Sequence, residues 1–352
     1  MKPRRIASRS AVITSFVLAI STVSSTHAAS DAWDGSTDAT WATGTNWLLD
    51  TTPPGVGETA TFNGAGNGNT IIDLGAGVTI GSVVFDTSST AAYTIGSGTV
   101  GSQTLTLGNV GGAITMNPTV TANQLFNSNL ALAASTTANN ATTYYKLENN
   151  SASNSLTIAG GISASTAGVK TLNVNGSGNT TISGAITSGS GNVSLFKTGS
   201  GTLTLSGGAT FSGAGITDGS NFTTSAVFRE GTTILDGGSY SNSGGEIAIG
   251  GVATHGGAGT NTTLQLNNGA TLNNISWLSL GRGNGTGSVS SDLVLNGNAT
   301  VTTTNLSAGF NAGSALNLPK GSITLNNTSQ LTVTSTATGT GGGAATFVLA
   351  ES

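Results

Sequence analysis

The most informative absences in this chain of 352 residues are those of cysteine and of charge. It contains no cysteine, so no disulfide can stabilise it, and packing of the chain itself must do so. Charged residues make up only 7% of the sequence, whereas ordinary soluble domains carry about 25%. Aromatic residues are scarce at 5%, yet 36% of all residues are hydrophobic. That apolar content excludes a disordered linker, although 54 residues are glycine.

What the chain has instead is alternation with a period of two residues, as in the Thr-Leu-Thr-Leu of residues 202–205. This pattern is typical of half-buried β-strands, and the glycine, serine and asparagine clusters between such segments predict tight turns. No segment after residue 30 has the 3.6-residue apolar period of a helix. Residues 117–154 are less regular, and we expect them to form a longer excursion from the strands.

Residues 232–333 repeat themselves. The segment 263–272 recurs as 292–301 and again as 322–331, at offsets of 29 and 30 residues, and a looser copy begins near residue 233. One such unit cannot bury its apolar side alone, so the copies must stack. We therefore predict an all-β fold, a right-handed parallel β-helix (β-solenoid), over residues 69–352.

Stacking of the repeats predicts two columns of identical side chains. Leu266, Leu295 and Leu325 would form one internal column. Asn267, Asn296 and Asn326 follow them at a turn, and Asp236 takes the same place in the first copy. Asparagine tolerates left-handed backbone, and its amide can bond to the same amide one coil away. We therefore predict an asparagine ladder along this corner.

The N-terminus has the features of a signal peptide at residues 1–28. Four basic residues precede an apolar run from 11 to 23, and small residues at Thr26 and Ala28 predict cleavage after Ala28. The run is too short to span a bilayer comfortably. Cleavage removes four of the 10 Lys and Arg residues, leaving 6 basic and 14 acidic residues. This balance argues against nucleic acid or an anionic membrane as partner, so we expect membrane contact only during export.

Residues 29–68 differ from the rest because they hold three of the 4 tryptophans, Trp33, Trp41 and Trp47. A solenoid needs a cap over the open end of its core, and indole rings supply apolar area that the remainder lacks. We predict an N-terminal aromatic cap here. The alternative is a platform of exposed rings on which carbohydrate stacks.

One segment resembles a known family. Residues 195–213 include Leu-Phe-Lys-Thr-Gly-Ser-Gly-Thr-Leu-Thr-Leu-Ser-Gly and then Ala-Thr-Phe-Ser-Gly. This is similar to the autotransporter-associated β-strand repeat, also called the passenger-associated transport repeat, which reads Leu-x-Lys-x-Gly-x-Gly-Thr-Leu-x-Leu-Ser-Gly and continues Asn-Thr-Tyr-Ser-Gly. Phenylalanine replaces the tyrosine, and an insertion at about 214–229 displaces the next strand to 231–234. The resemblance implies a secreted or surface-exposed β-helix of the passenger type, and it does not imply catalysis.

The C-terminus departs from that family. An autotransporter ends in a β-barrel, whereas residues 346–352 have the pattern of a segment in the middle of a solenoid. Two alternatives stay open: the chain is a fragment, or it is released by another route.

Groups that could carry chemistry are sparse. His255 is the only histidine after cleavage and lies in a glycine-rich turn, which excludes a Cys/His zinc site and a catalytic triad. Polysaccharide lyases share the β-helix fold but need clustered carboxylates. Asp218, Arg229 and Glu230 come nearest to such a cluster, and a charged loop that keeps the sheet soluble explains them equally well. We predict no catalytic residues, no metal and no cofactor.

These observations predict a non-catalytic structural or adhesive protein, secreted or on the cell surface, and in the outer membrane if a barrel follows. The alternative is a β-helical polysaccharide-binding protein or a polysaccharide lyase or hydrolase. Expected partners are glycans or other surface proteins. Self-association through the ends of the β-helix is a further expectation, since exposed strand edges favour pairing.

Overall fold

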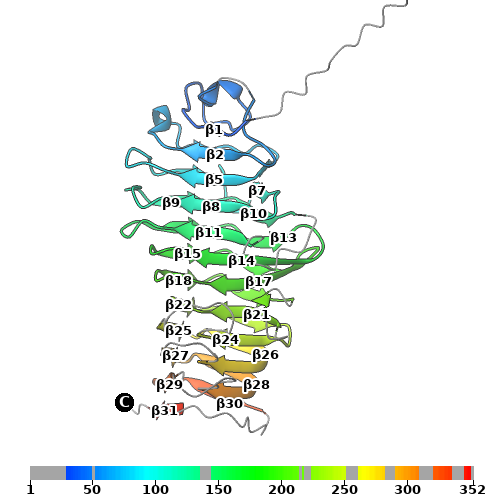
Figure 1. Ribbon diagram of the computed structural model, residues 1–352, viewed down its shortest axis with the longest axis vertical. Helices are drawn as coiled ribbons and strands as arrows, with labels where there is room; N and C mark the ends of the chain where they lie inside the picture. The colour runs from blue at the N-terminus through cyan, green and yellow to red at the C-terminus, as the bar shows by residue number, and fades with distance from the viewer. Residues whose placement is uncertain are drawn as a thin grey trace, which may run out of the picture.

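The computed structural model describes residues 29–49, 52–134, 144–213, 216–217, 223–250, 261–281, 290–308, 320–334 and 345–349. The predicted signal peptide at 1–28, His255 and Asp218 lie outside the described residues. The chain forms an elongated stack of short parallel strands, which extends from β1 at the top of the view to β31 at the bottom (Figure 1). The predicted all-β parallel β-solenoid is confirmed.

Each coil contributes strands to three faces. Face 1 and face 2 belong to a 20-stranded sheet, and face 3 is a separate 11-stranded sheet. Face 3 contains β3 (Ile71–Ile72), β6 (Thr94–Ile95), β9 (Gln124–Phe126), β12 (Leu156–Ile158), β15 (Thr180–Ile182), β18 (Thr202–Leu205), β22 (Gly231–Asp236), β25 (Thr262–Asn267), β27 (Ser290–Leu295), β29 (Lys320–Leu325) and β31 (Ala345–Leu349).

Face 1 contains β1 (Asp31–Ala32), β2 (Thr59–Phe62), β5 (Ser82–Phe85), β8 (Ala113–Met116), β11 (Tyr145–Asn149), β14 (Val169–Asn175), β17 (Asn192–Lys197), β21 (Thr223–Phe228) and β24 (Glu246–Ile249). Face 2 contains β4 (Val78–Ile80), β7 (Thr104–Leu107), β10 (Asn129–Leu132), β13 (Ile162–Ala164), β16 (Ile186–Thr187), β19 (Ala209–Phe211), β23 (Ser239–Asn242) and β30 (Gln330–Val333). The long strands β26 (Thr271–Leu280) and β28 (Thr300–Ala308) run through both faces.

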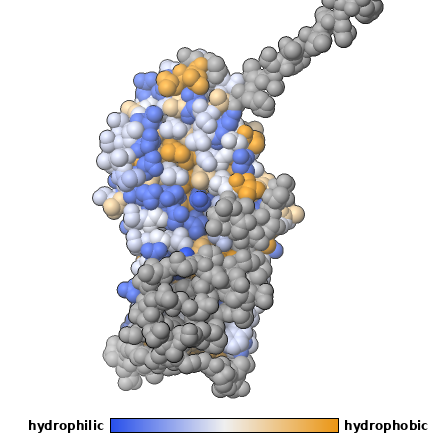
Figure 2. All heavy atoms as spheres, in the orientation of Figure 1, coloured by the Kyte–Doolittle hydropathy of each residue, from blue (hydrophilic) through white to orange (hydrophobic). Residues whose placement is uncertain are grey.

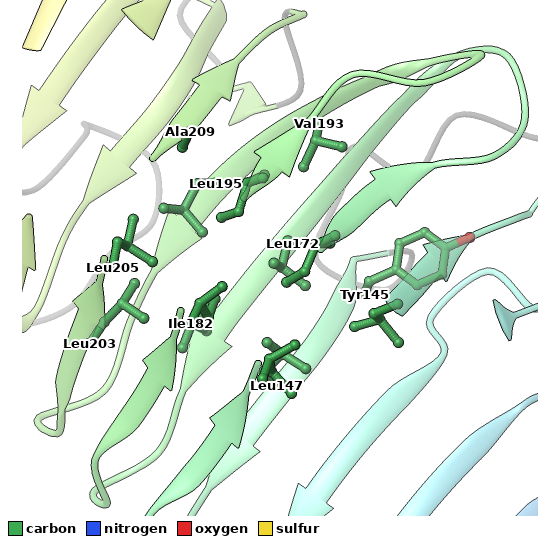
Figure 3. Close-up of a cluster of buried hydrophobic side chains, with 14 of the residues drawn as sticks. Tyr145, Leu147, Leu172, Ile182, Val193, Leu195, Leu203, Leu205 and Ala209 are labelled. Atoms are coloured by element: carbon green, nitrogen blue, oxygen red, sulfur yellow. The ribbon is translucent and has the colours of Figure 1, made fainter. Parts of the chain in front are cut away.

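The alternating sequence places every second side chain inside the coil. Figure 3 shows such inward side chains from neighbouring strands, among them Leu172 and Leu195, which are register partners in β14 and β17. Both are completely buried, as are Leu203 and Ile182 on the opposite face 3. Burying a leucine of this kind stabilises the fold by about 1.5–3 kcal/mol. The core is therefore one continuous apolar column inside the stack.

The N-terminal aromatic cluster is buried, as predicted for a cap. Trp47 meets Trp33 at 5.2 Å and Trp41 at 4.8 Å between ring centroids, both edge to face. Its indole N–H donates to the carbonyl oxygen of Trp41 at 2.9 Å. Because all three rings are at most 3% exposed, the alternative of an exposed stacking platform here is wrong. The short 3-10 helices η1 (Gly44–Asn46) and η2 (Gly66–Gly68) lie in this region, and β1 pairs with β2, so strand stacking begins inside the cap.

Two expectations about irregular segments need correction. Residues 117–154 do not leave the coil as a whole, because β9, β10 and β11 stack in register on neighbouring strands. The insertion after the family-like segment is also shorter than 214–229, because β21 is an ordinary strand of face 1. Among the described residues of this insertion, β20 (Ile216–Thr217) departs from the coil and pairs antiparallel with β21. Both expectations were wrong because the number of residues in a coil varies there, although the strands still stack on those of the neighbouring coils.

A second apolar cluster lies on the outside of face 1, and β20 packs against this face through it. Phe196 and Val227 are register partners that point outward, and Ala248 continues the row. Ile216 of β20 and Tyr144 pack over them. An outward phenylalanine needs such a cover because exposed apolar area is unfavourable.

Candidate functional site

The outward side of face 3 is the most regular surface among the described residues. Inward leucines alternate there with outward residues, and the strands are in register from β18 to β29. Neighbouring strands lie about 4.8 Å apart, so outward side chains repeat at that spacing. One outward column consists of Thr202, Thr232, Thr263, Asp292 and Ser322. The next column is mixed and consists of Thr204, Ile234, Gln265, Val294 and Thr324.

The predicted asparagine ladder borders this surface. The amide of Asn326 donates to Oδ1 of Asn296 at 2.7 Å, and the amide of Asn296 donates to Oδ1 of Asn267 at 2.8 Å. Asp236 is the register partner of Asn267, as expected. Its carboxylate accepts a hydrogen bond from the amide of Asn268, at 2.6 Å. We call the first threonine-rich column and this ladder together the polar face.

The left-handed backbone expected of the ladder asparagines belongs to the next residue instead. Positive φ occurs at Gly237, Asn268, Gly297 and Asn327, one position after each ladder residue. Only glycine and asparagine accept this conformation at low cost. At each turn the ladder residue forms the hydrogen bond between coils, and the residue after it adopts the left-handed backbone that reverses the chain.

The lysine of the family-like segment is buried at a corner. Lys197 is 2% exposed, and its ammonium donates to the carbonyl oxygens of Gly199 at 2.6 Å and of Thr198 and Glu230 at 3.0 Å. Burial lowers the pKa of Lys197 to about 8, and the carboxylate of Glu230 opposes that shift. Sequence reasoning missed this role, although the motif itself singled out the residue.

The glycines of the same segment are required by contact between coils. A Cβ at Gly199 would lie 2.5 Å from the carbonyl oxygen of Gly176, and one at Gly201 would lie 2.1 Å from that of Gly178. Both distances are shorter than any real contact. The Lys-x-Gly-x-Gly pattern thus describes a corner at which two backbones touch.

Of the residues that came nearest to a catalytic cluster, the structure describes Arg229 and Glu230. Glu230 accepts a hydrogen bond from the backbone N–H of Gly199 at 3.1 Å, and it borders the buried Lys197 corner. Burial lowers the pKa of Arg229, while the neighbouring Glu230 opposes the shift. Glu230 therefore takes part in the packing of that corner, and Asp218 is outside the described ranges.

Other carboxylates bridge adjacent coils. Asp86 accepts from the amide of Asn117 at 2.6 Å, and Glu246 accepts from the hydroxyl of Ser279 at 2.6 Å. Asp73 accepts from Gly75 N–H and from the amide of Gln103, and these bonds lower the pKa of its carboxyl group. In the described part of the chain, no group of three or more acids or histidines is placed to hold a metal. No helix in that part has the length and apolar character needed to cross a membrane.

Exposed apolar side chains are scattered over the surface. Figure 2 shows a face on which hydrophilic and near-neutral residues predominate, with small separate hydrophobic patches over the N-terminal coils. The large exposed apolar residues of the described ranges include Leu48, Val56, Ile71 and Trp277. Isolated residues of this kind are normal on a soluble surface.

No family model, curated protein or solved structure gives a significant match to this chain. What can be said of its function therefore follows from the β-solenoid and its surfaces.

Proposed function

We propose that this chain is a secreted or cell-surface β-solenoid with a structural or adhesive role and no catalytic one, of the kind that the autotransporter passenger resemblance implies. The observation that carries the proposal is the polar face, on which a hydroxyl-rich column runs in register over five coils of face 3 and the amides of three successive coils are hydrogen-bonded to one another. An ordered array of hydroxyl and amide groups, with Asp236 and Asp292 among them, suits contact with glycans or with other surface proteins.

The use of the carboxylates supports a non-catalytic role. Acid–base catalysis requires carboxyl groups that can reach a substrate with a suitable pKa. Asp86 and Glu246 instead accept hydrogen bonds from the coil above or below, and Glu230 bonds to the backbone of a corner. These groups stabilise the stack.

Export is tested by expressing the full chain in a Gram-negative host and sequencing the N-terminus of the mature protein. We expect cleavage after Ala28 and sensitivity of the exported protein to protease added outside the cell. A variant that lacks residues 2–28 is the control and should stay inside the cell. An intact full-length protein found only in the cytoplasm would refute the export part of the proposal.

Adhesion is tested with beads coated with the purified protein, whose attachment to cells is counted. Thr232→Asp and Thr263→Asp together place two further carboxylates in the column that contains Asp292. Attachment should fall several-fold, because ionised carboxylates are costly to remove from water when a partner binds. The matched control makes the same two changes at Thr79 and Thr106, which are register partners on face 2, and should attach like the parent. Release of new reducing ends or unsaturated sugars from polysaccharide would instead establish the lyase or hydrolase alternative.

A further inference from the structure

A groove of about 150 Å³ lies where β26 and β28 bend from face 2 into face 1. Its lining includes Asn274 and Ser276 of β26, Thr302 and Thr304 of β28, and Gly244 before β24. These residues carry no charge at neutral pH. The groove has room for a ring the size of one sugar.

A β-bulge creates the groove. Leu272 pairs with Val301 and Ile275 pairs with Thr303, so two residues of β26 oppose one residue of β28. Asn274, one of the two, has a φ of 55° in the left-handed region. Bulges redirect side chains and occur often beside functional sites. Gly244 leaves the space open, because a Cβ built there would meet nothing within 4 Å.

The polar side chains of the groove are unused. Within the described residues, the side chains of Asn274, Ser276, Thr302 and Thr304 make no hydrogen bond, while backbone groups around them are paired. Thr303 differs, because its hydroxyl donates to the carbonyl oxygen of Asn305 at 2.8 Å. Four neutral side chains with free donors and acceptors are therefore grouped around one small space.

An exposed tryptophan follows two of them in the same strand. Trp277 follows Ser276 and is 37% exposed, whereas the three tryptophans of the cap are at most 3% exposed. Its register partners on face 1 are Glu246 and Asn305. An indole combines a flat apolar surface with an N–H donor, so an exposed one can serve as a contact surface for a partner. The apolar side of a sugar ring is such a partner, while its hydroxyls bond to amides and hydroxyls.

The nearby charge selects against acidic sugars. Glu246 lies next to Trp277 across the strand pair, and its carboxylate already accepts from Ser279 at 2.6 Å. The whole sequence also has more acidic than basic residues, 14 against 10, which adds to this preference. A neutral hexose or pentose fits this environment, and a uronate or sulfated sugar does not.

We propose that the groove of Asn274, Ser276, Thr302 and Thr304, together with Trp277, which follows Ser276 in β26, binds one neutral sugar residue of a glycan. This inference rests on the proposed adhesive role and names its ligand class. Trp277 provides the stacking surface, and the threonine hydroxyls set the orientation of the ring.

The test uses the purified full chain and a panel of neutral oligosaccharides of glucose, mannose, galactose and xylose, with polygalacturonate as the acidic comparison. Quenching of tryptophan fluorescence by acrylamide reports on Trp277, because the other three rings are buried. We expect at least one neutral series to protect Trp277 from the quencher and to bind in calorimetry. Trp277→Ala should weaken binding tenfold or more, and Thr302→Val about threefold to tenfold.

Thr324→Val, an equally isosteric change on face 3, is the control and should bind like the parent. Circular dichroism of each variant verifies that the fold is intact, and Trp277→Phe, which keeps a ring, should retain part of the affinity. Binding that is unchanged in both Trp277→Ala and Thr302→Val overturns the proposal, as does binding of polygalacturonate alone or of nothing in the panel. Export and bead attachment are measured for the same variants. If both persist although sugar binding does not depend on Trp277 or Thr302, the proposed function stands and the sugar site is refuted.

Discussion

Replacing Gly201 by alanine should lower the free energy of unfolding by about 2 kcal/mol. The new Cβ would lie 2.1 Å from the carbonyl oxygen of Gly178, more than 1 Å inside ordinary contact. The obstacle is backbone, and Gly201 N–H donates to the carbonyl oxygen of Gly176 at 3.0 Å, which ties the two coils together. Overpacking of this kind costs about 1–3 kcal/mol, and alanine regains only about 0.4–1 kcal/mol through the unfolded chain.

Gly64→Ala is the matched control. A Cβ at Gly64 would meet nothing within 4 Å, and its backbone is outside the left-handed region. This variant should be as stable as the parent or slightly more stable. Denaturant unfolding followed by circular dichroism gives the midpoints, and tryptophan fluorescence from the cap shows whether the N-terminal coils unfold with the rest. Equal midpoints for the two variants would refute the argument that coil contact requires these glycines.

Three further changes test the corners and the cap. Burial lowers the pKa of Lys197 to about 8, so between about pH 8 and 10 the unfolded chain binds more protons than the folded chain and stability rises with pH. Lys197→Met should reduce that rise in denaturant titrations across the range, leaving the part due to Lys170, whose pKa burial also lowers. A variant that keeps the full rise would contradict the assignment. Asn296→Ala removes two ladder bonds and should cost about 1–2 kcal/mol, whereas the midpoint of the exposed Asn298→Ala should hardly change. Trp47→Ala empties a fully buried site and should cost about 3–5 kcal/mol, while Leu48→Ala at 65% exposure should leave thermal unfolding unchanged; similar melting temperatures would be evidence against a packed cap.

The repeats determined the register because identical residues recur at the same place in each coil. Leu266, Leu295 and Leu325 are register partners, as the offsets of 29 and 30 residues predicted. The asparagine ladder followed from the same alignment. Elsewhere the coil length changes without warning, since 23 residues separate Leu172 from its partner Leu195, and 31 separate Leu195 from Ala226. Extra residues accumulate at corners, where the alternating pattern carries no information.

The groove was not predictable for a related reason. A bulge is a difference in length between two neighbouring strands, and the sequence of either strand reads as an ordinary strand by itself. Trp277 stands out in the sequence as the only tryptophan beyond the cap, and that was the one available signal. The burial of Lys197 was hidden because a lysine is normally exposed, and only the corner carbonyls explain it.

Because the C-terminal coils stack in register, the number of coils, and so the length of the molecule, can change while the contacts between neighbouring coils stay the same. Removing residues 267–295 would join Leu266 to Asn296, and the chain would continue with the same turn because Leu295 and Leu266 are partners in adjacent coils. Asn326 and Asn296 already bond across one coil, so the shortened corner would meet Asp236 as Asn267 does now. Whole coils can thus be lost or duplicated without disturbing their neighbours, and the reach of the protein can evolve in steps of one strand spacing, about 4.8 Å.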